Sequence, residues 1–218
     1  MIITELVFVR HGEAQCNADG VVGGPTTCTG LTDLGYAQVK KVAARLAVEH
    51  QDKPFSALYA GPRLRLRQTG EILAQELRLP LRTESGLDGP IHGAADGKPW
   101  RDVKTAANGG PQAHPDAPWA EGSDTWNGYV ERAGDFLRGL IEQHEGDRVL
   151  VAAHGETVIA AHTLLLAIPR SSATGFTVSH ASITRWQRHH NRLGQRNWIL
   201  NCHNDAAHLA LLAPEGTS

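Results

Sequence analysis

Two short segments of this 218-residue chain carry a histidine, a glycine and a glutamate in the same order. The first reads Val-Phe-Val-Arg-His-Gly-Glu and ends at Glu13, and the second reads Val-Leu-Val-Ala-Ala-His-Gly-Glu and ends at Glu156. A histidine can act near pH 7 as a neutral nucleophile or as a proton carrier. Arg10, directly before His11, supplies a cation suited to an oxyanion with several oxygens. A matched pair favours catalysis, whereas one such histidine alone is usually structural.

Both histidines follow a segment that we expect to be a buried strand. Residues 3–9 and 148–153 are almost continuously apolar, which is typical of strands buried on both faces. In a layered α/β fold the functional site lies at the carboxyl ends of the parallel strands. If the two strands are neighbours, His11 and His154 face each other across one pocket. The glycine after each histidine lets a ligand approach the backbone closely.

The remaining pattern predicts a single domain over residues 1–218, with helices and strands alternating around a mostly parallel sheet. Helices are predicted over 33–49 with Thr32 as the cap, over 62–77, over 124–144 with Ser123 or Asp124 as the cap, and over 156–167. Shorter strands are predicted at 55–60 and 79–83, with a hairpin of 175–187 and 196–201 that turns near 191–194. Residues 84–123 are rich in Gly, Pro, Ala and Asp, which predicts a binding loop, a lid or a disordered stretch.

Composition excludes several classes of protein. Lys and Arg total 21 against 23 Asp and Glu, so a dedicated nucleic-acid-binding protein is not expected. No apolar run reaches the roughly 20 residues of a membrane span, and the first residues lack a signal-peptide pattern. Cys16, Cys28 and Cys202 are odd in number and show no C-x-x-C spacing. A reducing cytoplasm is therefore the expected setting.

Several motifs, taken in order, resemble the histidine phosphatase superfamily, which includes the cofactor-dependent phosphoglycerate mutases and the fructose bisphosphatases. The stretch from Arg10 to Glu13 is followed by Asn17 and Gly23, as in that family. The family segment S-x-L-x-R-A-x-Q-T-A resembles residues 60–70, with Arg65 in the arginine place, and its second histidine matches His154. Further matches are Leu31, Thr32, Gly35, residues 181–184 and residues 204–205, so the resemblance covers about 4–208. It implies a three-layer α/β/α sandwich like that of phosphoglycerate mutase.

The resemblance also implies a phosphohistidine mechanism with no metal and no cofactor. His11 would attack phosphorus through a neutral ring nitrogen. Preorganised donors around the transferred group would hold its negative charge. These donors are Arg10, Arg65, His154, the amide of Asn17 and the backbone N–H of Gly155 at an expected helix start.

The general acid is where the chain departs from the family. The family carries Glu in a segment like L-x-E-x-x-x-G-x-x-x-G-x-x-W, but residues 87–100 hold Gly89 at that position. Asp88 is our first choice for the acid, Glu84 the second and Asp96 the third. The alternative is that Asp88 only forms a turn before Gly-Pro.

Other basic residues need a separate interpretation. Arg63, Arg65 and Arg67 do not share a helix face, so one can bind phosphate while the others lie at the surface or rim. His162 follows His154 by eight residues, which excludes an H-E-x-x-H zinc site. His92 lies in the acid-bearing loop and could line the pocket. A metal cluster is a minor alternative for two other histidines, His203 and His208.

The leading interpretation is a metal-independent phosphatase acting on a small-molecule phosphate monoester. The alternatives are a phosphotransferase of the phosphoglycerate mutase type and a non-catalytic phosphate-binding regulatory protein. The missing glutamate at position 89 motivates the second alternative. Two valines, Val21 and Val22, stand where many members have an arginine or another polar residue, which favours a substrate less charged than a bisphosphorylated sugar acid.

Overall fold

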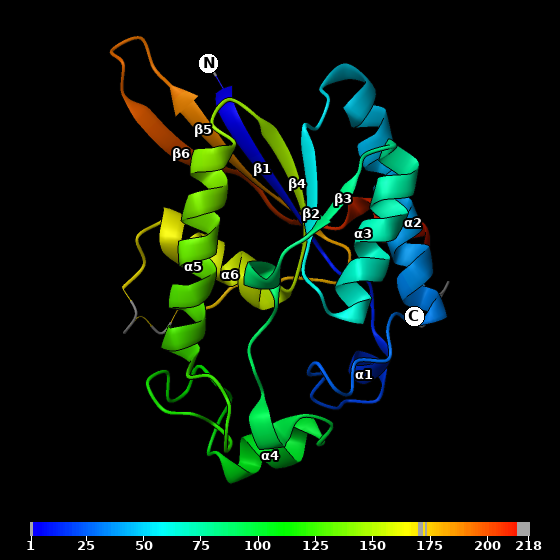
Figure 1. Ribbon diagram of the computed structural model, residues 1–218, viewed down its shortest axis with the longest axis vertical. Coiled ribbons are helices and arrows are strands. Elements are labelled where there is room, and N and C mark those ends of the chain that lie inside the picture. Colours follow the sequence, from blue (N-terminus) through cyan, green and yellow to red (C-terminus); the bar gives the residue numbers. More distant parts are fainter. Residues whose placement is uncertain (1, 170–171, 173, 213–218) are drawn as a thin grey trace, which may run out of the picture.

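A six-stranded sheet forms the centre of the computed structural model, which describes residues 2–169, 172 and 174–212 (Figure 1). The strands are β1 (Ile2–Arg10), β2 (Ala57–Ala60), β3 (Leu81–Thr83), β4 (Arg148–Ala153), β5 (Ile183–His190) and β6 (Arg196–Asp205). Their spatial order is β3-β2-β4-β1-β5-β6. The first four in this order pair in parallel, and β5 and β6 add an antiparallel edge. The predicted mostly parallel sheet is thus confirmed, with β5 and β6 as its exception.

Helices cover both faces of the sheet and make the predicted three layers. They are α1 (Gln15–Ala18), α2 (Asp33–Asp52), α3 (Leu64–Leu77), α4 (Trp100–Ala106), α5 (Trp126–Gln143) and α6 (Gly155–Leu165). Figure 1 shows α2 and α3 on one side of the sheet and α5 and α6 on the other.

The alternation of side chains along each strand fixes this layering. In β1, Leu6 and Phe8 belong to the core under α5 and α6, whereas Val7 and Val9 belong to the core under α2 and α3. All four side chains are almost fully buried. A strand buried on both faces is apolar at nearly every position, which is why residues 6–9 show no polar alternation.

The helix start before α5 differs from the sequence-based prediction. Thr32 caps α2 as predicted, because its side chain accepts the N–H of Gly35 at 3.0 Å. At α5 the cap is Thr125, so the prediction of Ser123 or Asp124 was wrong. Asp124 instead accepts the N–H of Ile91 at 2.9 Å, and Ser123 accepts the N–H of Ala120 at 3.2 Å. Both side chains are therefore used to hold the preceding loop.

Two segments also differ from the predicted elements. Residues 84–123 contain α4 and short 3₁₀ turns at Ser85–Leu87 and Gly93–Ala95, so this segment has more regular structure than predicted. Residues 175–182 were expected to begin a strand, but β5 begins at Ile183. The residues just before it lie across the end of β1, where Ala181 donates its N–H to His11 O at 3.2 Å. The residues just before β5 thus bond to the end of β1 instead of pairing as part of a strand.

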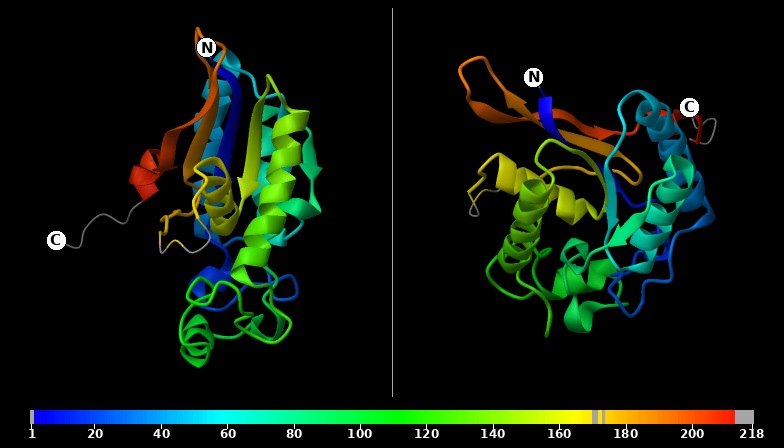
Figure 2. Two further views of the ribbon diagram at one scale, coloured as in Figure 1. Left: turned by 90° about the vertical axis from the view of Figure 1, so that its left-hand side faces the viewer. Right: turned by 45° about the horizontal axis from the view of Figure 1, so that its top comes forward.

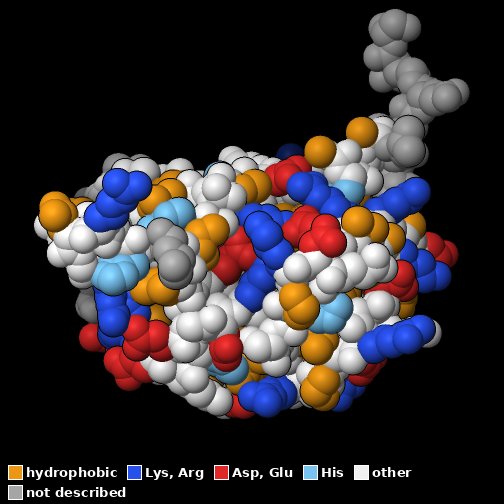
Figure 3. All heavy atoms as spheres, turned by 90° about the horizontal axis from the view of Figure 1, so that it is seen from above, with side chains coloured by type: hydrophobic (Ala, Val, Ile, Leu, Met, Phe, Trp, Pro, Cys, Tyr) orange, Lys and Arg blue, Asp and Glu red, His pale blue; other side chains and the backbone are white. Residues whose placement is uncertain are grey.

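The two ends of the sheet have different surroundings. At the carboxyl ends of the parallel strands, α1 and the segment containing α4 lie together, as Figures 1 and 2 show. The opposite end, seen in Figure 3, carries interleaved acidic and basic side chains, including the pairs of Arg148 with Glu49 and of Arg185 with Glu49. Among the described residues, no helix has both the length and the apolar character of a membrane span.

A close backbone contact holds the start of α2 against the segment after β1. A Cβ atom on Gly35 would lie 2.0 Å from the carbonyl oxygen of Glu13, and one on Gly12 would lie 2.4 Å from the carbonyl oxygen of Gly35. These glycines let the backbone just after His11 touch the backbone at the start of α2. The position of His11 therefore depends on the absence of side chains at both sites.

We predict that Gly35→Ala lowers the free energy of unfolding by about 1–3 kcal/mol, because the backbone at Glu13 must move to make room. The matched control is Gly139→Ala in α5, where a Cβ meets nothing within 4 Å. There alanine should raise the free energy of unfolding by about 0.5–1 kcal/mol. Denaturant unfolding measures the free energy of unfolding of each variant. Equal values for the two variants would contradict the close backbone contact at Gly35.

Candidate active site

The two predicted histidines meet because their strands are adjacent and in register. In the β1–β4 pair, Arg10 lies opposite Ala153, so the next residue of each strand leaves the sheet at the same place. The ring centroids of His11 and His154 are 5.3 Å apart, with the rings at 77°. The expected juxtaposition of the two imidazoles is therefore observed.

Hydrogen-bond partners assign a tautomer to each ring. The Nδ1 atom of His11 lies 2.7 Å from the carbonyl oxygen of Gly12, which can only accept, so Nδ1 carries the proton. The Nε2 atom of His11 then has an available lone pair. In His154, Nδ1 lies 3.4 Å from Nη2 of Arg65, which can only donate, so the proton is on Nε2. One ring thus offers a nucleophilic nitrogen, and the other offers an N–H donor.

Burial keeps both rings neutral. His11 is 3% exposed and His154 is 1% exposed. Burial, followed by the nearby charge of Arg65, lowers the pKa of each imidazole well below its ordinary value. A neutral His11 is the form that can attack phosphorus.

Two arginines beside the histidines donate only part of their hydrogen bonds to protein atoms. Arg10 donates through Nη1 to the carbonyl oxygen of Val178, and Arg65 donates through Nη1 to that of Gly23 at 3.0 Å. Unpartnered buried donors are uncommon in folded proteins. Within the described residues, the buried nitrogens without a hydrogen-bond partner include Arg10 Nε, Arg65 Nε, His154 Nε2 and His180 Nε2. An anion with several oxygens is the ligand that would satisfy such a set.

The two remaining predicted donors lie at helix starts. Gly155 is the first residue of α6, with His154 as its cap residue, so its N–H points out of the helix end. A Cβ at Gly155 would lie 3.6 Å from Arg10 Nε, which places this amide beside Arg10. The Oδ1 atom of Asn17, in α1, accepts the N–H of Ala14 at 3.1 Å. This bond leaves the amide NH₂ of Asn17 as its available donor.

Asp88 is the candidate acid that reaches the histidines. Its Oδ1 lies 3.8 Å from His154 Nε2 and 2.8 Å from Arg63 Nε. The N–H of Gly89 also donates to Oδ1 at 2.9 Å. The second and third choices do not share these contacts. Asp96 accepts from the Gly24 N–H and from the hydroxyls of Thr26 and Thr27, so it fixes the loop after α1. For Glu84, the described contacts include the bond from its backbone N–H to Ala60 O at 2.9 Å.

Sequence reasoning missed two residues of this site. Arg63 was expected at the surface or rim, but it is 3% exposed and lies beside Asp88, so that prediction was wrong. Arg63 precedes α3 as its N-cap residue with extended backbone angles, so the helical rotation used in the prediction does not apply to it. The ring of His180 lies 5.8 Å from that of His11. No sequence signal pointed to His180, because it lies in a segment expected to be a strand.

A cavity of about 280 Å³ opens next to Arg10. His92 lines it, as the sequence suggested, and so do Lys104, Trp126 and Glu156. The His92 ring packs against the indoles of Trp100 and Trp119. The cavity thus joins Arg10 to a mixed polar and aromatic wall.

Three of the other histidines, His162, His203 and His208, do not line this cavity. His162 Nε2 lies 3.0 Å from His203 Nδ1, and His208 Nε2 lies 2.9 Å from Ala181 O. In the part of the chain that the structure describes, no three His, Cys, Asp or Glu side chains converge as metal ligands.

Comparison with known proteins agrees with this geometry. Residues 6–201 match the profile of the histidine phosphatase superfamily (branch 1). The chain belongs to the histidine phosphatase superfamily. A metal-independent phosphoserine phosphatase of Arabidopsis thaliana is 28% identical to this histidine phosphatase over 216 residues, which cover 95% of this chain and 84% of that protein. A probable fructose-2,6-bisphosphatase, TIGAR A of Danio rerio, is 30% identical over 151 residues, which cover 67% of this chain and 57% of that protein.

Solved structures share the fold. The structure of a phosphoserine phosphatase mutant from Entamoeba histolytica in complex with phosphoserine has a TM-score of 0.77 at 20% identity. The match covers 94% of this histidine phosphatase and 99% of that chain. The predicted phosphoglycerate mutase-like fold and the predicted histidine-type phosphatase are confirmed.

We predict that this histidine phosphatase loses stability as the pH falls from 6.5 towards 4. Burial lowers the pKa values of His92, His162 and His180 from 6.5 to about 4. Between these values the unfolded chain binds protons that the folded chain does not, so stability is full above 6.5 and declines as the pH falls. Thermal unfolding across this range measures the effect.

The control is His162→Gln, which removes one of the buried histidines with a lowered pKa and should reduce the slope of stability against pH, whatever its own stability. A midpoint temperature that stays constant between pH 6.5 and 4 would show that the three histidines are protonated alike in both states.

Proposed function

We propose that this protein hydrolyses a small phosphate monoester through a phosphohistidine on His11, without a metal ion. The supporting observation is that His11, with its Nε2 unprotonated, lies beside His154 in a cluster whose buried donors include several with no protein partner. Arg10, Arg65 and His154 carry these donors and would hold the oxygens of the transferred phosphoryl group. This arrangement supplies charge stabilisation that a metal ion supplies in other phosphatases.

The proposed hydrolysis proceeds in two steps, phosphorylation of His11 and then hydrolysis of the phosphohistidine. In the first, a bond forms between His11 Nε2 and phosphorus while the ester oxygen leaves, and Asp88 gives that oxygen a proton. In the second, water attacks phosphorus, its proton passes to Asp88, and the N–P bond breaks to return His11 and inorganic phosphate. The separation of 3.8 Å between Asp88 Oδ1 and His154 Nε2 supports this role for Asp88.

We also propose that the leaving group is an amino acid. The lead candidate for the substrate is phosphoserine, which would release serine. The cavity beside Arg10 contains one carboxylate, Glu156, and one ammonium, Lys104. Glu156 is half-buried, and its charge acts on Arg10 and His92. A carboxylate here disfavours polyanionic substrates and complements an α-ammonium group, while Lys104 complements an α-carboxylate. Three free thiols support a cytoplasmic setting for the reaction.

We predict that His11→Ala lowers phosphatase activity by at least about 10⁴-fold, because the nucleophile is lost. Rapid quenching with ³²P-labelled phosphoserine, in chelator throughout, should give an acid-labile protein label in the parent chain and none in the variant. The control His189→Ala changes a histidine of β5, outside the site, and should keep both the phosphatase activity and the acid-labile label. A label that persists in His11→Ala would move the nucleophile elsewhere, and phosphate binding without turnover in the parent chain would indicate a regulatory protein.

We predict that Glu156→Gln raises the KM for phosphoserine by about tenfold or more, because a hydrogen bond between charged groups is lost. The KM for 3-phosphoglycerate, which has no ammonium group, should stay constant or fall. The control Glu76→Gln alters an exposed carboxylate of α3 and should change neither value. Equal increases in KM for both substrates would exclude Glu156 as the ammonium-binding residue.

A further inference from the structure

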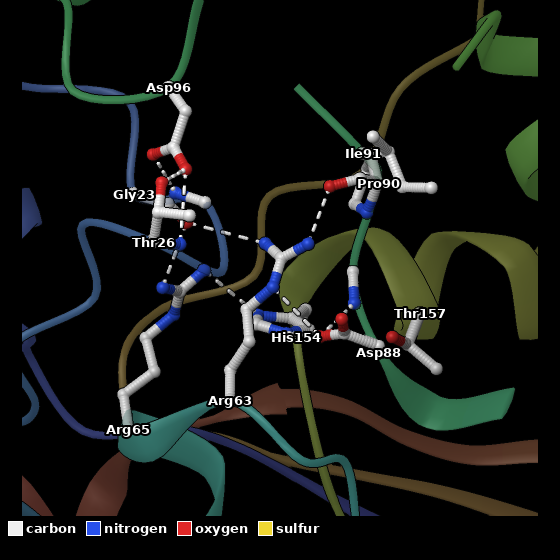
Figure 4. A network of polar contacts seen from close by, with 12 residues as sticks. Gly23, Thr26, Arg63, Arg65, Asp88, Pro90, Ile91, Asp96, His154 and Thr157 are labelled. Carbon is white, nitrogen blue, oxygen red and sulfur yellow. Dashed lines mark hydrogen bonds and ion pairs between the residues drawn. The ribbon is translucent and has the colours of Figure 1, made fainter. Parts of the chain in front are cut away.

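Arg63 is a buried arginine of the site with no role in the proposed phosphate contacts. Its side chain is 1% exposed. Nη2 donates to Pro90 O at 2.6 Å, and Nη1 lies 3.3 Å from its acceptor, Gly23 O. Figure 4 shows the guanidinium between the loop at Gly23 and the loop at 88–91. Arg63 thus joins two loops that both border the histidines.

The third contact of Arg63 is with Asp88. Nε lies 2.8 Å from Asp88 Oδ1, as an ion pair without the alignment of a hydrogen bond. Since the Gly89 N–H donates to the same oxygen, Oδ1 is held from two sides. Among the described residues, none bonds Oδ2. Oδ2 is therefore the oxygen available to exchange a proton with the substrate.

Gly89 is part of the same arrangement. A Cβ at this position would lie 3.0 Å from His154 Cδ2 and 3.1 Å from Arg63 Nη1, closer than nearly all real Cβ contacts. With Arg63 in place, the backbone at 89 has little room for a side chain. The missing glutamate at 89 is thus accompanied by a cation that fills the space and holds the neighbouring carboxylate.

Burying the charge of Arg63 carries a desolvation cost, which the ion pair with Asp88 offsets only in part. Burial lowers the pKa of this guanidinium, and the charge of Arg65 lowers it further, while Asp88 opposes both. An apolar side chain could fill the same space without this penalty.

We propose that Arg63 is a positioning residue that holds Asp88 in place for proton transfer to the leaving group. This inference rests on the proposed function of Asp88. Arg63 fixes Oδ1 by charge and fixes the backbone on both sides of the carboxylate through Gly23 and Pro90. In this arrangement Asp88 transfers the proton, and Arg63 holds the carboxylate where a longer side chain would otherwise have to reach.

The test uses substrates that differ in their need for an acid. An alkyl phosphate such as phosphoserine releases a basic oxygen that needs a proton, whereas p-nitrophenyl phosphate releases a stable anion. Arg63→Met should lower kcat/KM, which reports only the steps up to release of the leaving group, by about 10- to 100-fold for phosphoserine and by less than about threefold for p-nitrophenyl phosphate. The matched control, Arg67→Met, removes an exposed arginine of α3 and should change neither rate.

A double-mutant cycle separates positioning from a general structural effect. Asp88→Asn should show the same preference for the activated substrate, and Arg63→Met/Asp88→Asn should be no slower than Asp88→Asn alone. Additive losses, or an equal loss on both substrates in Arg63→Met, would overturn the role of Arg63. If Arg63→Met does not fold, Arg63→Lys keeps a charge without the planar fork and should show the same selectivity with a smaller loss.

The two proposals fail in different ways. If Asp88→Asn slows both substrates equally, Asp88 is not the acid and the proposed function loses that step. If Asp88→Asn is selective and the Arg63 variants are not, the acid stands and the positioning role is wrong.

Discussion

The site depends on placing three guanidinium groups beside two neutral imidazoles in a space that is almost closed to water. Arg10, Arg63 and Arg65 are largely buried, and their mutual repulsion disfavours this arrangement. Backbone carbonyls provide much of the compensation, since each arginine donates to at least one of them. These carbonyls belong to the loops at Gly23, Pro90 and Val178. Arg10 and Arg65, which would bind phosphate, therefore also hold two of these loops, and Arg63 holds the loop at Pro90.

This arrangement reconciles a positive site with a chain of net charge −2. Away from the site, arginines pair with carboxylates across the sheet, as Arg148 does with Glu5 and Glu49. At the site, the same residue type meets mainly carbonyls, with Asp88 as a half-buried carboxylate partner of Arg63. The arginines of the site thus keep more of their positive charge unpaired than Arg148 does. A count of charges over the whole chain cannot reveal this difference.

The sequence predicted the parts of this molecule that follow from local pattern. Continuous apolar runs identified β1 and β4, and the shared His-Gly-Glu context placed His11 and His154 at their ends. Arg63 could not be placed, because it lies just outside α3, where helical spacing no longer sets direction. His180 could not be found, because its position depends on a long-range contact between Ala181 and His11. Thr125 was missed for a similar reason, since the tertiary contacts of Asp124 decide which residue caps α5.

Burial has opposite consequences for the nucleophile and for its surroundings. Burial and nearby guanidiniums keep His11 neutral, which preserves the lone pair on Nε2. The same burial leaves N–H groups of Arg10, Arg65 and His154 without partners, which costs stability in the absence of an anion. On the proposed function, a phosphate dianion would satisfy these donors and add the negative charge that the cluster lacks. The cost of burying the cluster and the proposed affinity for phosphate would then have one cause, and a variant that lowers this cost by removing a cation should also weaken phosphate binding.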